Sequence, residues 1–151
     1  MSFEINSEKT KQHPVIIDFL ETVDQVTRGE VLKFEQVQSK ELFKYSNSLM
    51  IAEFDFEKDD FKFRFCGSNI TEYYAMNITG KYISETTDEK FSVHFIQNYK
   101  DIMREKKNIF YYGTLQPRGK DYIDWYQVSM PLERNGKVNE VISFVFVDLQ
   151  I

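Results

Sequence analysis

The chain has 151 residues, of which 42% are hydrophobic and 28% charged, and its formal net charge is −5 at pH 7. That length fits one domain, and the acidic balance argues against nucleic acid as a partner, because nucleic-acid-binding domains gather Lys and Arg on one face. No apolar run approaches the roughly 20 residues of a membrane span. The single cysteine, Cys66, excludes an internal disulfide. We therefore expect a cytoplasmic protein without a membrane partner.

The first predicted element is an amphipathic helix over residues 15–28. Apolar residues recur there at three- and four-residue steps, which is the period of one helix face. Pro14 suits the first turn and Gly29 the C-terminal cap. The helix could cover a sheet or pair with a second copy of the chain. Because its apolar stripe is too large to leave in water, we expect a homodimer through this helix.

A β-hairpin is predicted next, followed by a short helix. Apolar and polar residues alternate up to Phe54 and again from Phe61 to Phe65, on either side of the charged turn 57–60. This period of two is typical of half-buried strands. Gly67 ends the hairpin, and Ser68 is a suitable N-cap for the short helix.

The second half of the chain predicts one long helix and three strands. The helix begins near Asp88 and ends in a basic run, residues 104–107, which suits the negative end of a helix dipole. Strand-like segments follow at 109–116, 122–132 and 138–149, and the turn before the last carries Asn135-Gly136, a pair that favours tight hairpins. The whole order predicts an α+β fold, a five-stranded antiparallel sheet with helices on one face and an additional N-terminal amphipathic helix.

This order of elements resembles the PAS fold, and two motifs add to the resemblance. The stretch Phe63-Arg64-Phe65-Cys66-Gly67 through Asn77-Ile78-Thr79-Gly80-Lys81 is similar to the F-x-R-x-x-G...G-x-D-x-T-G-[RK] signature of a bacterial subfamily of small stand-alone PAS proteins, although Ala75 and Asn77 replace its Gly and Asp. The strand ending in Pro131-Leu132 resembles another segment of that subfamily. The likeness divides the chain into an N-terminal helical extension, residues 1–33, and a PAS-like sensory domain, residues 34–151.

The resemblance implies a non-catalytic sensory domain that binds a small molecule or a signalling protein and relays its state through the N-terminal helix and the sheet surface. Its pocket would be apolar and aromatic, although large rings fill solid cores as readily. The expected pocket residues are Phe54, Phe63, Tyr73, Tyr74, Phe95, Tyr99, Tyr126, Val128 and Phe144. The identity of the ligand and of any cofactor stays open.

Two other functions remain open from the sequence. The chain could be a protein-interaction module with a filled core and no ligand. It could also be a small cone-fold isomerase or dehydratase, an enzyme that needs a polar side chain directed inward from the strands. Asp124 and Gln127 are the only suggestions for that side chain.

Three further residues have specific expectations. His94 lies on the helix that supplies the proximal haem ligand in haem-binding PAS sensors, but it stands about 120° from the apolar stripe of that helix, so we expect no haem or metal ligation. Cys66 lies outside any flavin-reactive motif and is expected to be a small buried hydrophobe. Gly80 follows a point where the helical pattern stops, and we expect it to adopt a positive φ.

Overall fold

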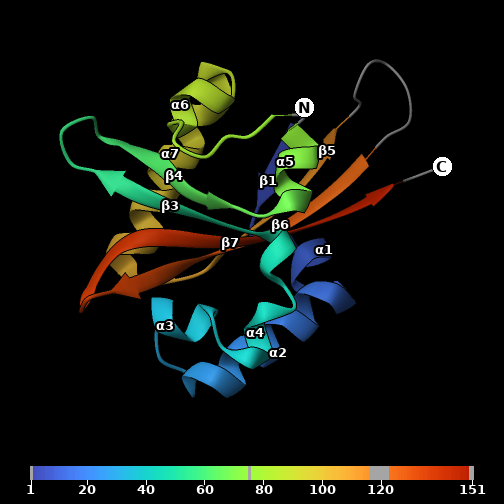
Figure 1. Ribbon diagram of the computed structural model, residues 1–151. Helices are drawn as coiled ribbons and strands as arrows, with labels where there is room; N and C mark the ends of the chain where they lie inside the picture. Colours follow the sequence, from blue (N-terminus) through green and yellow to red (C-terminus); the bar gives the residue numbers. More distant parts are fainter. Residues whose placement is uncertain (1, 75, 116–122, 150–151) are drawn as a thin grey trace.

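A computed structural model describes residues 2–74, 76–115 and 123–149 (Figure 1). The helices are α1 (Glu8–Lys11), α2 (Pro14–Thr27), α3 (Phe34–Val37), α4 (Lys40–Phe43), α5 (Ser68–Tyr74), α6 (Ile83–Thr86) and α7 (Glu89–Glu105), with a 3-10 turn at Ser46–Ser48. The strands are β1 (Ser2–Ile5), β2 (Leu32–Lys33), β3 (Leu49–Asp55), β4 (Asp60–Cys66), β5 (Ile109–Leu115), β6 (Ile123–Arg134) and β7 (Lys137–Leu149).

The strands form one sheet in the order β1-β5-β6-β7-β3-β4, with β2 attached to β6. Strands β3 and β4, a helical crossover and strands β5–β7 follow one another as predicted, which gives the expected α+β arrangement. The expected count of five strands is wrong, because the described residues form a sheet of seven strands. The two additional strands, β1 and β2, come from residues 1–33, so this segment contributes to the sheet as well as supplying helices. The division of the chain near residue 33 stays a prediction.

Helices cover both faces of this sheet rather than one (Figure 1). Helices α5, α6 and α7 pack on one face, around a core that includes Phe61, Phe95 and Ile102. Helices α2 and α4 pack on the other face, around a second core that includes Leu42 and Leu132. Alternate residues of each central strand therefore belong to different cores.

Helix α2 buries its apolar stripe against the chain's own sheet. Ile16 is 0% exposed and Phe19 1% exposed, and the Phe19 ring stacks on Phe144 of β7 with centroids 4.4 Å apart. The sheet therefore satisfies this stripe, which removes the reason given for a second copy of the chain, and the homodimer itself stays a prediction. Among the described residues, no helix is both long enough and apolar enough to cross a bilayer.

Two predicted turn geometries are present. Asn135 and Gly136 have φ of 53° and 77°, as a tight hairpin with both central residues at positive φ requires. Gly80 has φ of 86°, and its N–H donates to the Phe63 carbonyl at 2.8 Å, which ties the turn to the outer edge of β4. The connection between the strand-like segments predicted at 109–116 and 122–132 lies outside the described residues.

Replacing Gly80 with alanine should lower the free energy of unfolding by about 1 kcal/mol, because a Cβ is strained at this φ. No atom lies within 4 Å of the position that the Cβ would take, so the cost comes from the backbone alone. Gly80→Val should cost more, since a β-branched side chain is less compatible still with positive φ. Urea unfolding measures both variants, and midpoints equal to that of the parent would contradict the expectation.

Candidate functional site

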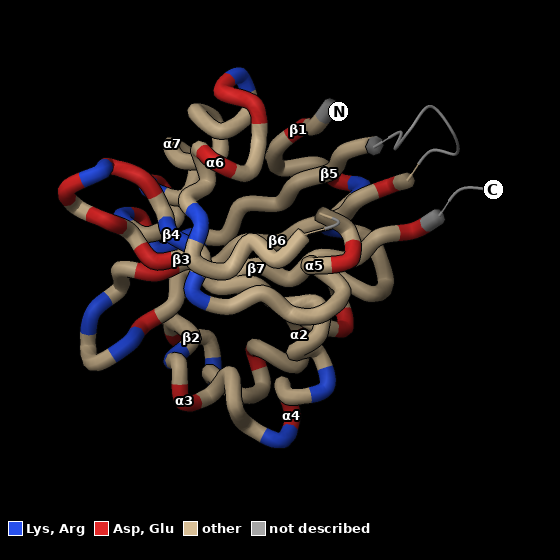
Figure 2. Tube along the Cα trace, turned by 45° about the horizontal axis from the view of Figure 1, so that its top comes forward, with Lys and Arg blue, Asp and Glu red and all other residues tan. Residues whose placement is uncertain are grey.

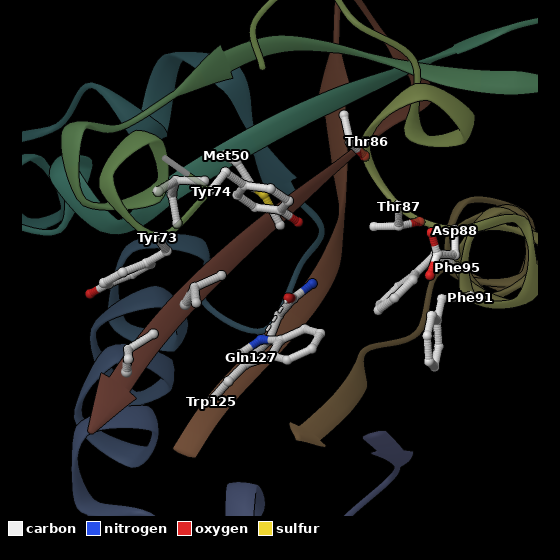
Figure 3. Close-up of a pocket in the computed structure, with 13 residues that line it drawn as sticks. Met50, Tyr73, Tyr74, Thr86, Thr87, Asp88, Phe91, Phe95, Trp125 and Gln127 are labelled. Atoms are coloured by element: carbon white, nitrogen blue, oxygen red, sulfur yellow. Dashed lines mark hydrogen bonds between the residues drawn. The ribbon is translucent and has the colours of Figure 1, made fainter. Parts of the chain in front are cut away.

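A cavity of about 390 Å³ lies between the sheet and helices α5 and α7, a volume within the range of small-molecule sites. Tyr73 and Tyr74 of α5 form one side, and Phe91 and Phe95 of α7 form the opposite side (Figure 3). Strand residues form the floor, and residues 86–88 complete the α7 side. We call this space the aromatic cavity.

Simple periodicities place these rings. Phe91 and Phe95 are four residues apart on α7, so they lie one turn apart on the same helix face. Trp125 and Gln127 are two residues apart on β6, so both point to the same face of the sheet. The rings of Phe95 and Trp125 lie nearly parallel, with centroids 6.0 Å apart and an interplanar angle of 26°. Helix and strand thus meet in one aromatic corner of the cavity.

A buried hydrogen-bond network lies in the floor. Gln127 is 2% exposed, and its Nε2 donates to the Tyr99 hydroxyl at 3.1 Å and to Ser129 Oγ at 2.9 Å. Its Oε1 accepts a hydrogen bond of 3.1 Å from Trp125 Nε1. Ser143 Oγ joins Tyr99 and Ser129 at 3.0 Å and 2.6 Å. Such a satisfied network holds its members in one orientation, so the Trp125 ring and the Gln127 amide are fixed beneath the cavity.

The structure brings together only some of the expected pocket residues. Tyr73, Tyr74 and Phe95 line the aromatic cavity. Phe63 and Tyr99 line a void of about 20 Å³ directly beside it. Phe54 belongs to the same core but packs against Phe56 and Phe61, away from the cavity lining.

Three of the expected pocket residues lie on the wrong face of the sheet. Tyr126, Val128 and Phe144 pack in the core beneath α2, on the opposite side from the cavity. Successive side chains of a strand alternate between the two faces of the sheet. An assignment of the pocket-facing residues that is shifted by one position therefore places all of them on the opposite face. The residues that do face the cavity from β6 and β7 are Trp125, Gln127, Val145 and Val147.

The two strand residues considered for catalysis, Asp124 and Gln127, lie on opposite faces of the sheet. Gln127 points inward, whereas Asp124 has the opposite parity on β6 and accepts a hydrogen bond of 2.9 Å from the Tyr112 hydroxyl. Asp88 is the one carboxylate in the described lining of the cavity, and it is exposed. The cavity therefore presents no described pair of groups suited to general acid and base roles.

Cys66 packs against the same core as the cavity but is not part of its described lining. Burial raises the pKa of the Cys66 thiol to about 11, and a hydrogen bond with Thr79 opposes that rise. The thiol is therefore protonated at neutral pH, which makes it a poor nucleophile.

His94 lies outside the cavity. Its side chain is exposed and meets the Phe3 ring edge-on with centroids 6.4 Å apart, in a groove between β1 and α7. Among the described residues, no group of three or more His, Cys, Asp and Glu is placed to hold a metal ion.

We expect the protein, expressed with added haem precursor and flavin, to be colourless after purification. His94 cannot reach a cofactor in the aromatic cavity from its exposed position, and a haem needs an axial ligand. An absorption spectrum measures this. A strong haem band that disappears in His94→Ala would contradict the expectation.

No family model matches the sequence, and no curated protein matches it. Several solved chains are similar, and among them is one described as an RNA-binding light-oxygen-voltage receptor, with a TM-score of 0.49 and 10% sequence identity. The similarity covers 73% of this chain and 33% of that one, so the chain spans about a third of that protein's length.

Proposed function

We propose that this chain is a non-catalytic, PAS-like sensory domain that binds a small, mainly apolar molecule in the aromatic cavity. The observation that carries the proposal is the cavity itself, about 390 Å³ beside the sheet. An interaction module with a filled core does not need such a space, and cavities with apolar walls and a few fixed polar groups are typical ligand sites. The described lining offers rings and an amide rather than an acid–base pair, which favours binding over catalysis.

The N-terminal segment is the route by which we propose that the bound state is relayed. Phe3 of β1 stacks on Phe95 with centroids 4.9 Å apart and meets Phe91 at 5.7 Å. Both phenylalanines line the cavity. A ligand that moves either ring therefore changes the contact that holds β1, and a preference of the ligand for one arrangement shifts the population of the two states.

The next residues continue this route towards α2. Thr10 Oγ1 of α1 donates to the Tyr111 carbonyl of β5 at 2.6 Å, and the N–H of Asn6 donates to the Phe110 carbonyl. We propose that a protein partner reads the altered N-terminal segment and the sheet surface. Charged residues of both signs are interspersed around the loops in Figure 2, and this pattern favours a protein partner over nucleic acid.

A cavity-filling variant tests the binding proposal. Val147 of β7 lines the cavity, and Val138 of the same strand packs against the same core outside the described lining. We expect the neutral, planar dye Nile red to bind saturably to the parent, and Val147→Phe to weaken that binding about tenfold or more by steric overlap. Dye fluorescence during titration gives the affinity.

Val138→Phe is the matched control, and we expect it to bind the dye as the parent does. Equal weakening in both variants would show a general loss of structure and would contradict binding in the cavity. If neither variant changes the affinity for the dye, the dye binds outside the cavity, and this result would also contradict the proposal.

A further inference from the structure

The chemistry of the cavity's walls restricts the kind of molecule that it accepts. Its described lining contains neither Lys, Arg nor His, and its only charged side chain is the exposed Asp88 at the start of α7. An ion buried without a counter-ion loses its hydration without compensation. An anion would meet no opposite charge here, and a cation would meet only a carboxylate that water screens.

The two tyrosines of α5 differ in what their hydroxyls face. Tyr73 is 38% exposed, and its hydroxyl points away from the other lining residues, whereas the Tyr74 hydroxyl points in among them (Figure 3). The Tyr74 hydroxyl makes no hydrogen bond with any residue that the structure describes. Burial raises the pKa of Tyr74 well above its ordinary value, so this hydroxyl keeps its proton. It is an unused hydrogen-bond donor inside an apolar space.

The Gln127 amide, another polar group of the cavity, is already occupied as a donor. The Nε2 of Gln127 donates to Tyr99 and Ser129, which uses both of its hydrogens. A ligand that carries a hydrogen-bond acceptor must therefore find its donor elsewhere. The Tyr74 hydroxyl is such a donor on the α5 side of the cavity, and the buried Thr87 hydroxyl, which has no hydrogen-bond partner among the described residues, is another on the α7 side.

We infer that the ligand is an uncharged aromatic molecule bearing a hydrogen-bond acceptor, such as a carbonyl oxygen, that accepts from the Tyr74 hydroxyl while its ring lies among Phe91, Phe95 and Trp125. The inference rests on the proposed function of the cavity. It goes further in stating the ligand's charge and in naming the side chain that distinguishes an acceptor-bearing ligand from a pure hydrocarbon.

Three probes of similar size test the inference. 2-Acetylnaphthalene carries an acceptor, 2-ethylnaphthalene carries none, and 2-naphthoate is an anion. The indole N–H of Trp125 reports binding by nuclear magnetic resonance, because it is the chain's only tryptophan and lies in the cavity floor. We expect 2-acetylnaphthalene to bind about fivefold more tightly than 2-ethylnaphthalene, from one hydrogen bond, and 2-naphthoate to bind at least about tenfold more weakly than the ketone.

Two matched variants test whether the Tyr74 hydroxyl causes the difference in affinity between the ketone and the hydrocarbon. Tyr74→Phe should remove the advantage of the ketone over the hydrocarbon and leave the affinity for 2-ethylnaphthalene unchanged. Tyr73→Phe should preserve the ratio of the two affinities. Retention of the ketone's advantage in Tyr74→Phe, or binding of 2-naphthoate as tight as that of the ketone, would overturn the inference and leave the proposed function standing. If none of the three probes shifts the Trp125 signal, the proposed function itself fails.

Discussion

Replacing Gly67 with alanine should lower the free energy of unfolding by about 3 kcal/mol, the largest effect of any small substitution considered for this chain. A Cβ at position 67 would overlap the backbone carbonyl oxygens of Ser46 and Asn47, which belong to the 3-10 turn before β3. The backbone cannot withdraw easily, because the Gly67 N–H donates to the Leu49 carbonyl at 2.8 Å. The strain should therefore spread into the start of β3.

Gly136→Ala is the control for this experiment. Gly136 has φ of 77°, and no atom lies within 4 Å of its Cβ position, so this variant should cost about 1 kcal/mol from backbone strain alone. Urea unfolding of the two variants compares them. A cost at Gly67 no greater than that at Gly136 would show that the turn at Ser46 and Asn47 yields, and would contradict the expectation.

Glu140→Ala should have the second-largest effect, a loss of about 2 kcal/mol in the free energy of unfolding. The Glu140 side chain is 3% exposed and accepts hydrogen bonds from Arg134 Nε at 2.7 Å and from its NH2 nitrogen at 3.3 Å. Its Oε1 also lies 3.7 Å from Arg64. The Arg134 guanidinium covers the Phe34 ring, with its Cζ 3.5 Å from the ring centroid. Removing the carboxylate leaves a partly buried cation without its counter-ion.

Glu53→Ala supplies a closely matched control. Glu53 is the cross-strand neighbour of Glu140 and also contacts Arg64, at 3.2 Å, but its side chain is 47% exposed. Exposed ion pairs contribute under about 1 kcal/mol, so this variant should remain close to the parent in chemical denaturation. If Glu140→Ala and Glu53→Ala lower the free energy of unfolding by the same amount, the burial of Glu140 does not determine how much its ion pairs stabilise the protein.

The elements predicted correctly from the sequence are those whose signal is local. Helix α7 and the β3–β4 hairpin repeat their apolar residues at a helical or strand period over many positions, and the hairpin at Asn135 and Gly136 depends on two adjacent residues. Strand β1 has four residues and pairs Ser2 with Thr114, far along the chain, and β2 has two residues. No local period indicates strands of this kind, because their formation depends on a partner strand.

The site was predicted less completely because its floor is partly polar. On β6 the apolar character of Tyr126 and Val128 favours them as pocket-facing residues, whereas it is Gln127 that lies on the cavity side, on the same face as Trp125 and Ser129. A polar residue is stable in a core only when it has hydrogen-bond partners. Those of this network include side chains of α7 and β7, which lie far from Gln127 in the sequence. Gly67 illustrates the same limit, since its need for glycine arises from a backbone contact with residues 46 and 47.

The central claim, that the aromatic cavity binds a small uncharged molecule, is tested most directly by the fluorescence of Trp125 during titration with Nile red. Trp125 is the only tryptophan in the chain and lies in the cavity floor, so its emission reports on that space. We predict that the dye quenches the Trp125 emission and that this quenching saturates at about one dye per chain. Val147→Phe should abolish the quenching, and Val138→Phe should leave it unchanged. Dye binding that leaves the Trp125 emission unchanged would contradict the claim.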